Sequence, residues 1–482
     1  MINIALIPID NRPVCYQLPK QIACLSKDCN LILPDIKLLG DLNHSADIDS
    51  ILKWLDSLTD IDVIIITLDT IAYGGLIPSR RSNDKIDVIK SRIDKLKKII
   101  EKKKIKVYAF SSIMRISNNN VNEEEKEYWN LYGKKIFEYS YNLHKMNKLK
   151  EIDSSVMTEI TTEIPQDIIS DYLETRKRNF EINKYYVELK RLGYINTLVF
   201  SKDDCSEYGF NVEEAEALKE LSKEISDIYI KTGADEIPLT LLSRALNKEK
   251  RIKIAPVYTN PDYINKISKY EDISVKESVE SQIELAGGIV SDENNCDLIL
   301  LVNNFKEEQG ELVMNIKVPL FNKKLVLPDK PYFIADIMNA NGSDNNFVKE
   351  LFEQDSFKEF YGYSAWNTTG NTLGSAIAVA LTYFGTKHPD KNAFEKLQLT
   401  RFLDDWAYQA NVRSKIRNNY ENLSATVLKM NMQNYEKFIC EKFAIKKRKI
   451  EYKFPWHRFF EIEINIKKVY IKLPFIDILF YE

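Results

Sequence analysis

The stretch 195-INTLVFSKDDCSEYG-209 joins an apolar run to a pair of charged residues. The run from Ile195 to Phe200 is rich in β-branched and aromatic side chains, which is typical of a strand that is covered on both faces. Asp203 and Asp204 close this segment, and two adjacent carboxylates repel each other. Because a hydrophobic core does not require such a pair, we interpret it as part of a functional site at the end of the strand.

Apolar runs alternate with amphipathic segments along the first half of the chain. Strands are expected at Ile2–Ile9, Asn30–Leu33, Val63–Leu68, Lys106–Phe110, Thr197–Phe200 and Ile228–Lys231. Helices are expected at Ser45–Leu58, Lys85–Lys103, Glu123–Asn147, Pro165–Leu192 and Val212–Ile225. Strands that lack apolar–polar alternation and are separated by helices indicate parallel sheets. Six such units in about 245 residues favour an α/β fold with a complete or incomplete (β/α)8-type barrel, and a doubly wound sheet is the alternative.

A second alternating region follows this first half. Its strands are expected at Ile252–Val257, Leu298–Val302 and Tyr332–Ile334, and its helices at Ser274–Ala286 and Thr372–Tyr383. It either completes the barrel or forms a separate flavodoxin-like layer. A long amphipathic helix is expected at Phe394–Asn419, and a small antiparallel sheet between Lys447 and Glu482. We therefore expect a barrel-like catalytic region at 1–248, a second α/β region at 249–388 that completes or flanks the site, and a C-terminal helical and antiparallel β region at 389–482.

The charge and the cysteine pattern narrow the classes of function. The chain has 68 basic and 71 acidic residues and a net charge of −3, which argues against a nucleic-acid or anionic-membrane partner. The first residues, MINIALIPID, form no basic leader, and no run reaches the roughly 18 apolar residues of a membrane helix, so we expect a cytoplasmic protein. The six cysteines form no CxxC pair and are expected to be reduced. The sequence leaves homo-oligomerisation open.

Motifs for metal and nucleotide binding are missing from the sequence. The four histidines are scattered, which argues against a zinc site or a serine–histidine triad. No GxGxxG follows the first strand, and no GxxxxGKS/T occurs. The segment 370-GNTLG-374 is too short a pattern to specify a phosphate site. We therefore expect no cofactor and no dedicated metal site.

Acidic residues recur where the expected strands end. These positions are Asp10, Asp69, Asp203 with Asp204, Asp235 with Glu236, and Asp336. In parallel α/β folds the strand ends lie on one face, which carries the active site of barrels and the ligand crevice of open sheets. An aspartate after a strand is also a common turn former or helix cap. Several of these positions are followed by loops such as 71-IAYGGLIPSR-80 and 338-MNANGSDNN-346, whose Gly and Asn residues let the backbone approach a ligand.

Arginines, amides and aromatic residues cluster at the same ends. Arg12 follows the first strand and Arg115 follows the fourth, where each either pairs with carboxylates or binds an anionic substituent of a ligand. The segment 361-YGYSAWNTTGNTLGSA-376 places Trp366 beside Asn367. An aromatic ring that covers the apolar face of a sugar, next to amides and carboxylates for its hydroxyl groups, is typical of a carbohydrate site.

Six motifs carry a resemblance to a known family. They are PIDNRPV, LDTIAYGGLIPSR, YAFSSIMR with EYWNLYG, DDCSEYG, GADEIPLTLLSRA and AWNTTGNTLG. In this order they resemble a bacterial family catalogued as domain of unknown function 4127, over about residues 1–385, and the resemblance implies no activity. The Asp–Asp pair is also similar to that of barrel β-N-acetylhexosaminidases. That likeness implies one carboxylate that orients a 2-acetamido group and one that acts as the general acid.

Hydrolysis of a glycoside fits these features best. The reaction uses two carboxyl groups, one of them protonated near neutral pH, and crowding raises the pKa of one carboxyl in a pair. We predict Asp204 as the general acid and Asp203 as the acetamido-orienting or nucleophilic carboxylate, with the reverse assignment open. Asp69 and Glu236 are further catalytic candidates.

The expected ligand is a small glycoside or oligosaccharide, N-acetylhexosaminides included. The residues expected to bind it are Asp10, Arg12, Tyr73, Arg115, Tyr208, Asp235, Asp336, Asn341, Trp366 and Asn367. Two alternatives stay open. Clustered carboxylates also suit a metal-dependent hydrolase with Mg²⁺, Mn²⁺ or Ca²⁺, and the same groups suit a sugar- or metabolite-binding protein without catalytic activity.

Overall fold

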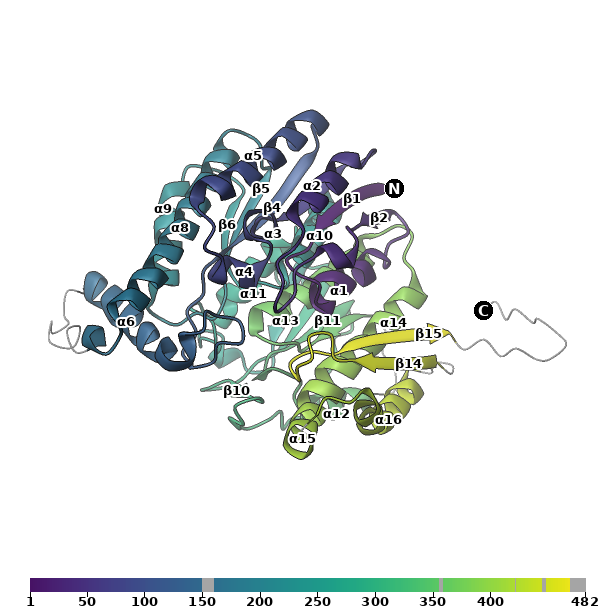
Figure 1. The fold of residues 1–482 in the computed structure, drawn as a ribbon. Coiled ribbons are helices and arrows are strands. Elements are labelled where there is room, and N and C mark those ends of the chain that lie inside the picture. Colours follow the sequence, from purple (N-terminus) through teal and green to yellow (C-terminus); the bar gives the residue numbers. More distant parts are fainter. Residues whose placement is uncertain (150–159, 355–358, 421, 444–447, 469–482) are drawn as a thin grey trace.

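Two parallel β-sheets form the framework of the computed structural model (Figure 1). The structure describes residues 1–149, 160–354, 359–420, 422–443 and 448–468. The first sheet contains β1 (Ile2–Ile7), β2 (Cys29–Ile32), β3 (Val63–Thr67), β4 (Lys106–Ile113), β5 (Thr197–Lys202) and β6 (Ile228–Thr232). Its spatial order is β2-β1-β3-β4-β5-β6. The order therefore reverses at β1, and in open α/β sheets such a switch point leaves a crevice at the carboxyl ends of the strands.

Helices cover both faces of the first sheet. They are α1 (Pro13–Ala23), α2 (Ile48–Ser57), α3 (Leu68–Tyr73), α4 (Leu76–Arg81), α5 (Ile86–Lys103), α6 (Trp129–Leu149), α8 (Gln166–Arg191), α9 (Phe210–Ser222) and α10 (Ile237–Asn247), with a 3₁₀ turn η1 at Ile36–Leu38. Alternate residues of β3 serve the two faces: Val63 and Ile65 pack with α1 and α10, whereas Ile64 and Ile66 pack with α2, α5 and α8. This two-sided burial explains why the strands lack apolar–polar alternation.

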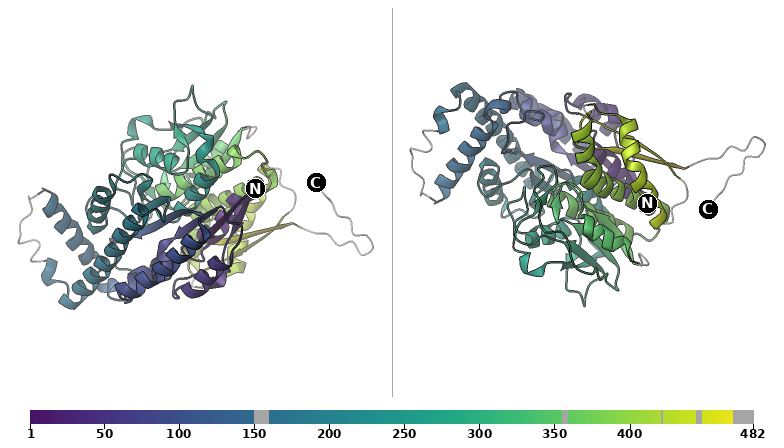
Figure 2. Two further views of the ribbon diagram at one scale, coloured as in Figure 1. Left: turned by 90° about the horizontal axis from the view of Figure 1, so that it is seen from above. Right: turned by 90° about the horizontal axis from the view of Figure 1, so that it is seen from below.

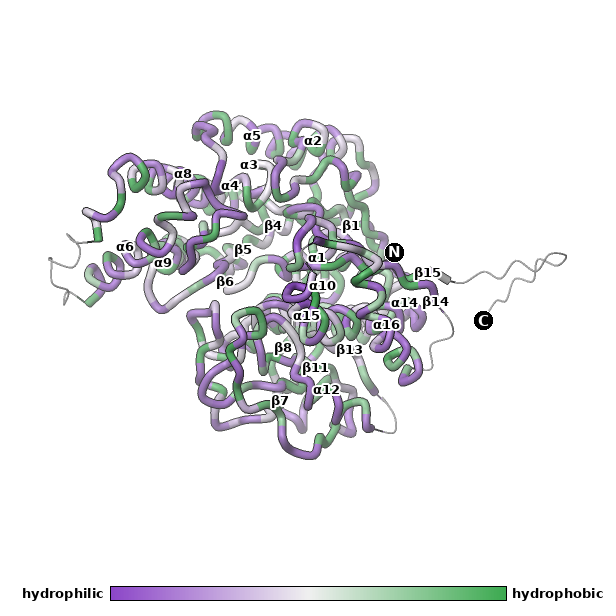
Figure 3. The backbone as a smooth tube through the Cα atoms, turned by 60° about the horizontal axis from the view of Figure 1, so that its bottom comes forward, coloured by the Kyte–Doolittle hydropathy of each residue, from purple (hydrophilic) through white to green (hydrophobic). Residues whose placement is uncertain are grey.

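The outer helices follow the amphipathic pattern expected of them. Helix α5 alternates hydrophilic and hydrophobic residues along its length (Figure 3). Its buried residues are Ile89, Ile93, Leu96 and Ile100, which lie three or four positions apart and form one stripe toward the sheet. None of the helices in the described ranges is long and apolar enough to span a bilayer.

The second sheet repeats the topology of the first. Its strands are β7 (Lys253–Tyr258), β8 (Ile289–Val290), β9 (Leu298–Asn303), β11 (Tyr332–Asp336) and β13 (Phe360–Ser364), in the order β13-β11-β9-β7-β8. Numbered along the chain within this sheet, that order is again 2-1-3-4-5, as in flavodoxin-like folds. Its other elements are η2 (Lys248–Lys250), η3 (Pro261–Tyr263), α11 (Val275–Leu285), α12 (Asn345–Phe352), α13 (Thr369–Gly385) and the short parallel pair β10 (Gly310–Glu311) and β12 (Asn339–Ala340).

Two helices join the sheets. Helix α10 contacts β3 and β4 of the first sheet, α13 contacts β11 and β13 of the second, and the two helices pack on each other. Gly374 in α13 makes this contact close, because a Cβ there would lie 2.3 Å from Glu236 Cγ and 3.2 Å from Thr240 Cγ2. The two halves of the chain consequently lie side by side, as the views from above and below show (Figure 2).

The C-terminal part lies against the second sheet (Figure 1). It consists of α14 (Lys391–Arg401), a π-helical stretch η4 (Phe402–Val412), α15 (Arg413–Asn419), α16 (Ala425–Lys442) and the antiparallel pair β14 (Arg448–Lys453) and β15 (Glu463–Lys468). Helix α12 and strand β13 contact η4, and β13 and α1 contact α14, so these contacts join the C-terminal part to the rest of the chain. The expected antiparallel sheet is thus present at β14 and β15, and positions 447 and 469–482 lie outside the described residues.

The α/β class with parallel sheets is confirmed. In the described ladders, β2 and β6 are the edges of the first sheet and pair neither with each other nor with the second sheet, so a (β/α)8 barrel is not confirmed. One element boundary matters for the site. The helix expected at Glu123–Asn147 begins only at Trp129. Residues 123–125 are acidic and form a loop, in which Glu124 and Glu125 bind Arg115 and Arg80.

Candidate functional site

A cleft of about 300 Å³ lies at the carboxyl ends of the strands. Its lining comes from the segments that follow β1, β3, β4, β5 and β6 in the first sheet and β7, β9, β11 and β13 in the second, from α15, and from the loop between β14 and β15. Its acidic residues are Asp10, Glu123, Glu124, Asp203, Asp204, Asp235 and Glu311, and its arginines are Arg12, Arg115, Arg413 and Arg458. The excess of acidic residues disfavours a highly charged anion such as a nucleotide.

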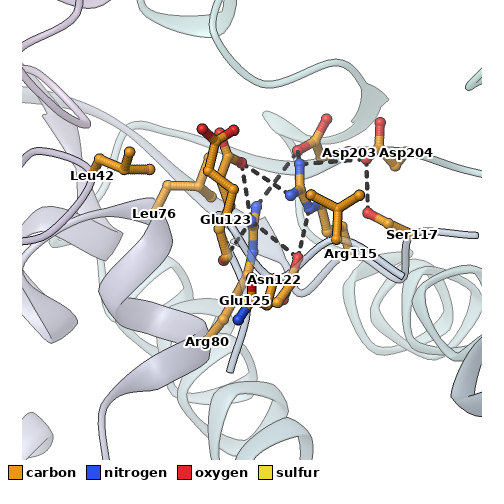
Figure 4. Close-up of polar contacts among 12 residues, drawn as sticks. Leu42, Leu76, Arg80, Arg115, Ser117, Asn122, Glu123, Glu125, Asp203 and Asp204 are labelled. Atoms are coloured by element: carbon orange, nitrogen blue, oxygen red, sulfur yellow. Dashed lines mark hydrogen bonds and ion pairs between the residues drawn. The ribbon is translucent and has the colours of Figure 1, made fainter. Parts of the chain in front are cut away.

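Asp203 and Asp204 lie in this cleft, directly after β5 (Figure 4). Arg115 Nη1 is 3.5 Å from Asp203 Oδ2 and 3.3 Å from Asp204 Oδ2. Ser117 Oγ donates a hydrogen bond to Asp204 Oδ2 at 3.0 Å, and Arg80 Nη2 lies 3.6 Å from Asp203 Oδ2. Burial and the neighbouring Asp203 raise the pKa of Asp204 to about 6, against the opposing effect of Arg115.

The loop before α6 surrounds Arg115 with further carboxylates (Figure 4). Arg115 Nη2 lies 2.9 Å from Glu124 Oε2, and its Nε donates to Glu125 Oε1 at 2.9 Å. Burial on its own would raise the pKa of Glu124, but Arg115, Arg458 and Arg80 hold that pKa well below its usual range. Arg115 therefore serves as the centre of a carboxylate network.

Arg12 links the ends of β1 and β6. Its Nε donates to Asp10 Oδ2 at 2.9 Å, while Nη1 and Nη2 donate to the two carboxylate oxygens of Asp235 at 3.0 and 2.6 Å. This is the bidentate geometry for which arginine is suited. Burial on its own would lower the pKa of Arg12. The carboxylates of Asp10 and Asp235 outweigh this effect and raise the pKa above its usual value. The donors of Arg12 are therefore occupied by the protein's own carboxylates.

Aromatic residues reach the cleft from the C-terminal loop. Trp456 donates from Nε1 to Asn11 Oδ1 at 2.7 Å, and the guanidinium groups of Arg12 and Arg458 lie 5.1 and 4.7 Å from the centre of its ring. Such cation–π contacts stabilise arginines that are partly desolvated. Phe460 from the same loop and Tyr270 also line the cleft.

Two asparagines and a glutamate line the side of the cleft that belongs to the second sheet. Asn341 donates from Nδ2 to Glu311 Oε1 at 2.6 Å, and its backbone N–H donates to Asn367 O at 2.8 Å. Asn341 and Asn367 have φ angles of 64° and 61°, in the left-handed region that Asn tolerates better than most residues. Both asparagines line the cleft.

Eight of the residues predicted for the site line one cleft. They are Asp10, Arg12, Arg115, Asp203, Asp204, Asp235, Asn341 and Asn367. The other six predicted residues are not part of its lining.

Asp69 and Tyr73 belong to α3 and do not line the cleft. Asp69 does not begin a glycine-rich loop as expected, because α3 starts at Leu68, directly after β3. It accepts a hydrogen bond from Ser112 N at 2.9 Å, and burial raises the pKa of Asp69 to about 7. Tyr73 is buried beneath the Arg178 guanidinium, 5.3 Å from its ring centre. Both residues contribute to packing at the end of β3.

Glu236 and Asp336 are also buried outside the cleft. Glu236 accepts hydrogen bonds from Gln282 Nε2 at 2.8 Å and from Ala234 N at 3.0 Å, and burial raises the pKa of Glu236 to about 8. Asp336 accepts from Asn303 Nδ2 at 2.8 Å and caps the loop before α12 through a bond from Asp344 N at 2.7 Å. Both carboxyl groups therefore stabilise turns.

The two remaining aromatic predictions lie elsewhere. Tyr208 packs edge-on against Tyr141 and His144. Trp366 is buried and lines a separate cavity of about 30 Å³. Trp456 is the tryptophan that lines the cleft.

The sequence did not indicate several residues that line the cleft. They are Glu123, Glu124, Tyr270, Glu311, Arg413, Trp456, Arg458 and Phe460. None of them directly follows a strand of the two large sheets, so no strand end in the sequence marks them. Within the described ranges, no group of three or more His, Cys, Asp or Glu is arranged to hold a metal ion.

Comparison with known proteins assigns a family. The family model described as "Protein of unknown function (DUF4127)" matches residues 4–465, nearly the whole chain. No curated protein matches the sequence.

Two solved structures show a faint similarity. An alpha-L-fucosidase GH29 from Bacteroides thetaiotaomicron is 12% identical, with 80% of this chain and 70% of that chain covered and a TM-score of 0.18. A bacterial fucosidase with a triazole inhibitor is 11% identical, with the same coverage and the same TM-score of 0.18. Similarity at this level shows neither a shared fold nor a shared function.

Proposed function

We propose that this chain, which belongs to the DUF4127 family, hydrolyses a glycosidic bond with the carboxyl groups of Asp203 and Asp204. One observation carries the proposal. Asp204 lines the cleft beside a second carboxyl group, and burial together with Asp203 raises its pKa to about 6. A carboxyl group with this pKa keeps its proton in a useful fraction of molecules near neutral pH, as a general acid must.

The partner carboxylate has a defined position. Asp203 Oδ2 and Asp204 Oδ2 both lie within 3.5 Å of Arg115 Nη1, so these two oxygens are no more than about 7 Å apart. Carboxyl pairs of glycosidases are separated by about 5–5.5 Å in retaining enzymes and about 6.5–9.5 Å in inverting ones. We assign Asp204 as the general acid and Asp203 as the nucleophile or as the group that orients a substrate acetamido group.

The other groups of the cleft support a carbohydrate ligand. Tyr270 and Phe460 offer apolar rings, and Asn367 offers an amide for hydroxyl groups. A cleft of about 300 Å³ accommodates one or two sugar residues, at the lower end of the range for ligand sites.

One observation favours a second function, carbohydrate binding without catalysis. Arg12 and Arg115 each bind at least two carboxylates of the protein, which produces a rigid polar wall. Rigid polar groups of this kind serve recognition as well as they serve catalysis.

Hydrolysis is tested with aryl α- and β-glycosides, N-acetylhexosaminides included, with and without EDTA. The variants are Asp203→Asn and Asp204→Asn, and Asp262→Asn provides the matched control, since it makes the same change at an exposed residue outside the cleft. We expect aryl release that resists EDTA, is retained in Asp262→Asn and falls at least about 100-fold in either cleft variant.

Other outcomes have distinct meanings. Release that is lost with EDTA would favour a metal-dependent hydrolase. Release that is equal in Asp204→Asn and the wild type would refute the assigned general acid. Binding of a sugar in thermal-shift assays without release of any aryl group would favour the non-catalytic function.

A further inference from the structure

Three of the four arginines in the cleft form ion pairs with carboxylates of the protein. Arg12 contacts Asp10 and Asp235, and Arg115 contacts Glu124 and further acidic residues. Arg458 contacts Glu124 from the loop before α6 and Glu461 from its own loop. The anionic substituent that the sequence led us to expect at Arg12 and Arg115 would therefore compete there with the protein's own charges.

Arg413, the first residue of α15, differs from the other three. Its Nη1 donates to Gln409 Oε1 at 3.0 Å, and its guanidinium lies 4.8 Å from the centre of the Phe460 ring. Among the described residues, no carboxylate lies within 4.0 Å of it. Its Nε and Nη2 have no hydrogen-bond partner in the described part of the chain, yet they are not sealed from solvent. Two donors thus remain free on a residue that lines the cleft.

The free donors belong to a side chain that is otherwise enclosed. Arg413 is only 7% exposed, and burial lowers its pKa, although Tyr408, Glu461 and Glu311 oppose that shift. A buried guanidinium without a counter-ion is costly, because the interior replaces its hydration poorly. A negatively charged ligand group would remove that cost.

Glu311 does not satisfy this need. It accepts hydrogen bonds from Asn341 Nδ2 at 2.6 Å and from Val313 N at 3.2 Å, and a further bond from Met314 N. Its carboxylate is therefore committed to its own turn, and it acts on Arg413 only through space. Asn341 and Glu311 line the same cleft as Arg413 and hold each other in place.

We propose that Arg413 forms a carboxylate subsite in the cleft, and that the preferred sugar ligand carries a single carboxylate, as hexuronic acids do. The planar fork of arginine matches a carboxylate through two parallel hydrogen bonds. A singly charged group fits better than a phosphate dianion, because the cleft has seven acidic residues and four arginines. The inference deepens the proposed function and rests on it for the carbohydrate nature of the ligand.

The test measures binding to the full chain by isothermal titration calorimetry. The probes are the methyl glycosides of D-glucuronate and D-galacturonate, their neutral counterparts methyl glucoside and methyl galactoside, and glucose 6-phosphate. The variants are Arg413→Gln and Arg413→Lys. The matched control is Arg417→Gln, which removes the same charge from an exposed position one turn along α15.

We expect one uronide to bind at least tenfold more tightly than its neutral counterpart. Arg413→Gln should abolish this preference, and Arg417→Gln should retain it. Arg413→Lys keeps the charge but not the fork, so it should retain only part of the preference. If Arg413→Gln does not fold, as judged by its thermal transition, the uronide preference of Arg413→Lys is compared with that of the wild type instead.

Several results would overturn the inference. They are equal binding of uronide and neutral sugar, no binding of either uronide, a preference unchanged in both Arg413 variants, and tighter binding of the phosphate than of the uronides. The same results test hydrolysis independently of the subsite. Uronide binding that depends on Arg413 without any aryl release would refute hydrolysis and retain the subsite, whereas aryl release without a uronide preference would refute the subsite alone.

Discussion

Arg458 Nη1 donates to Glu124 Oε1 at 2.7 Å, between residues that are 334 positions apart in the chain. Glu124 belongs to the loop before α6, and Arg458 to the loop between β14 and β15. The contact therefore joins the C-terminal loop to the first sheet at the edge of the cleft. It also brings Trp456 and Phe460 into the lining.

Replacing Arg458 should destabilise the folded chain. Arg458→Gln removes the ion pairs to Glu124 and Glu461. Removal of one partner from a buried pair costs about 3–5 kcal/mol, and we expect about 2 kcal/mol because Glu124 retains Arg115. The free energy of unfolding from urea titrations at pH 7 measures this loss. Lys453→Gln, at an exposed position of β14, should change it by less than about 0.5 kcal/mol, and an equal loss in both variants would contradict the prediction.

The activity should decline on the alkaline side of the pH profile. Asp204 has a pKa of about 6 and acts in its protonated form, so kcat/KM should fall as pH rises through about 6. Ser117 donates to the Asp204 carboxylate and stabilises its charged form. Ser117→Ala should therefore raise this pKa and move the alkaline limb to higher pH. A limb that moves to lower pH, or that persists in Asp204→Asn, would contradict the assignment.

Asp204→Asn should stabilise the fold at high pH while it impairs activity. In the unfolded chain Asp204 ionises at about pH 4, whereas in the folded chain its pKa is about 6. The wild type therefore loses stability between about pH 4 and 6, and this loss is complete above that range. Two pKa units correspond to about 3 kcal/mol, but the side chain is 28% exposed, so we expect a gain of about 1–2 kcal/mol at pH 8. Thermal denaturation at pH 8 and at pH 3.5 measures it, and an equal gain at both pH values would refute the electrostatic origin.

Gly374→Ala should disturb the contact between the two sheets. The new Cβ would lie 2.3 Å from Glu236 Cγ. A shift of α10 that relieved this contact would also move Asp235, which directly precedes Glu236 in the chain. Overpacking of this kind costs about 1–3 kcal/mol. Ser375→Ala is the matched control on the same helix, since its buried hydroxyl has no hydrogen-bond partner and its removal should be close to neutral. Differential scanning calorimetry compares the two variants, and similar melting temperatures would show that the helices separate easily.

The sequence by itself determined the class of the fold and the region of the site. Apolar runs without alternation specify strands that are covered on both faces, and helical segments between them require parallel pairing. Because the carboxyl ends of parallel strands share an edge, the sequence also predicted that Asp10, Asp203 and Asp235 would lie together. These features depend on local side-chain periodicity, which is visible in one sequence.

Only the tertiary structure decided which strand-end residues reach the cleft. Asp69 does not reach the cleft because α3 begins directly after β3. Glu236 does not reach it because its side chain lies against Gly374 of α13. Trp456 and Arg458 enter the cleft through contacts with residues more than 300 positions away. Helix direction and sheet partners follow from the packing of the whole chain, so no local pattern records which charges are finally brought together.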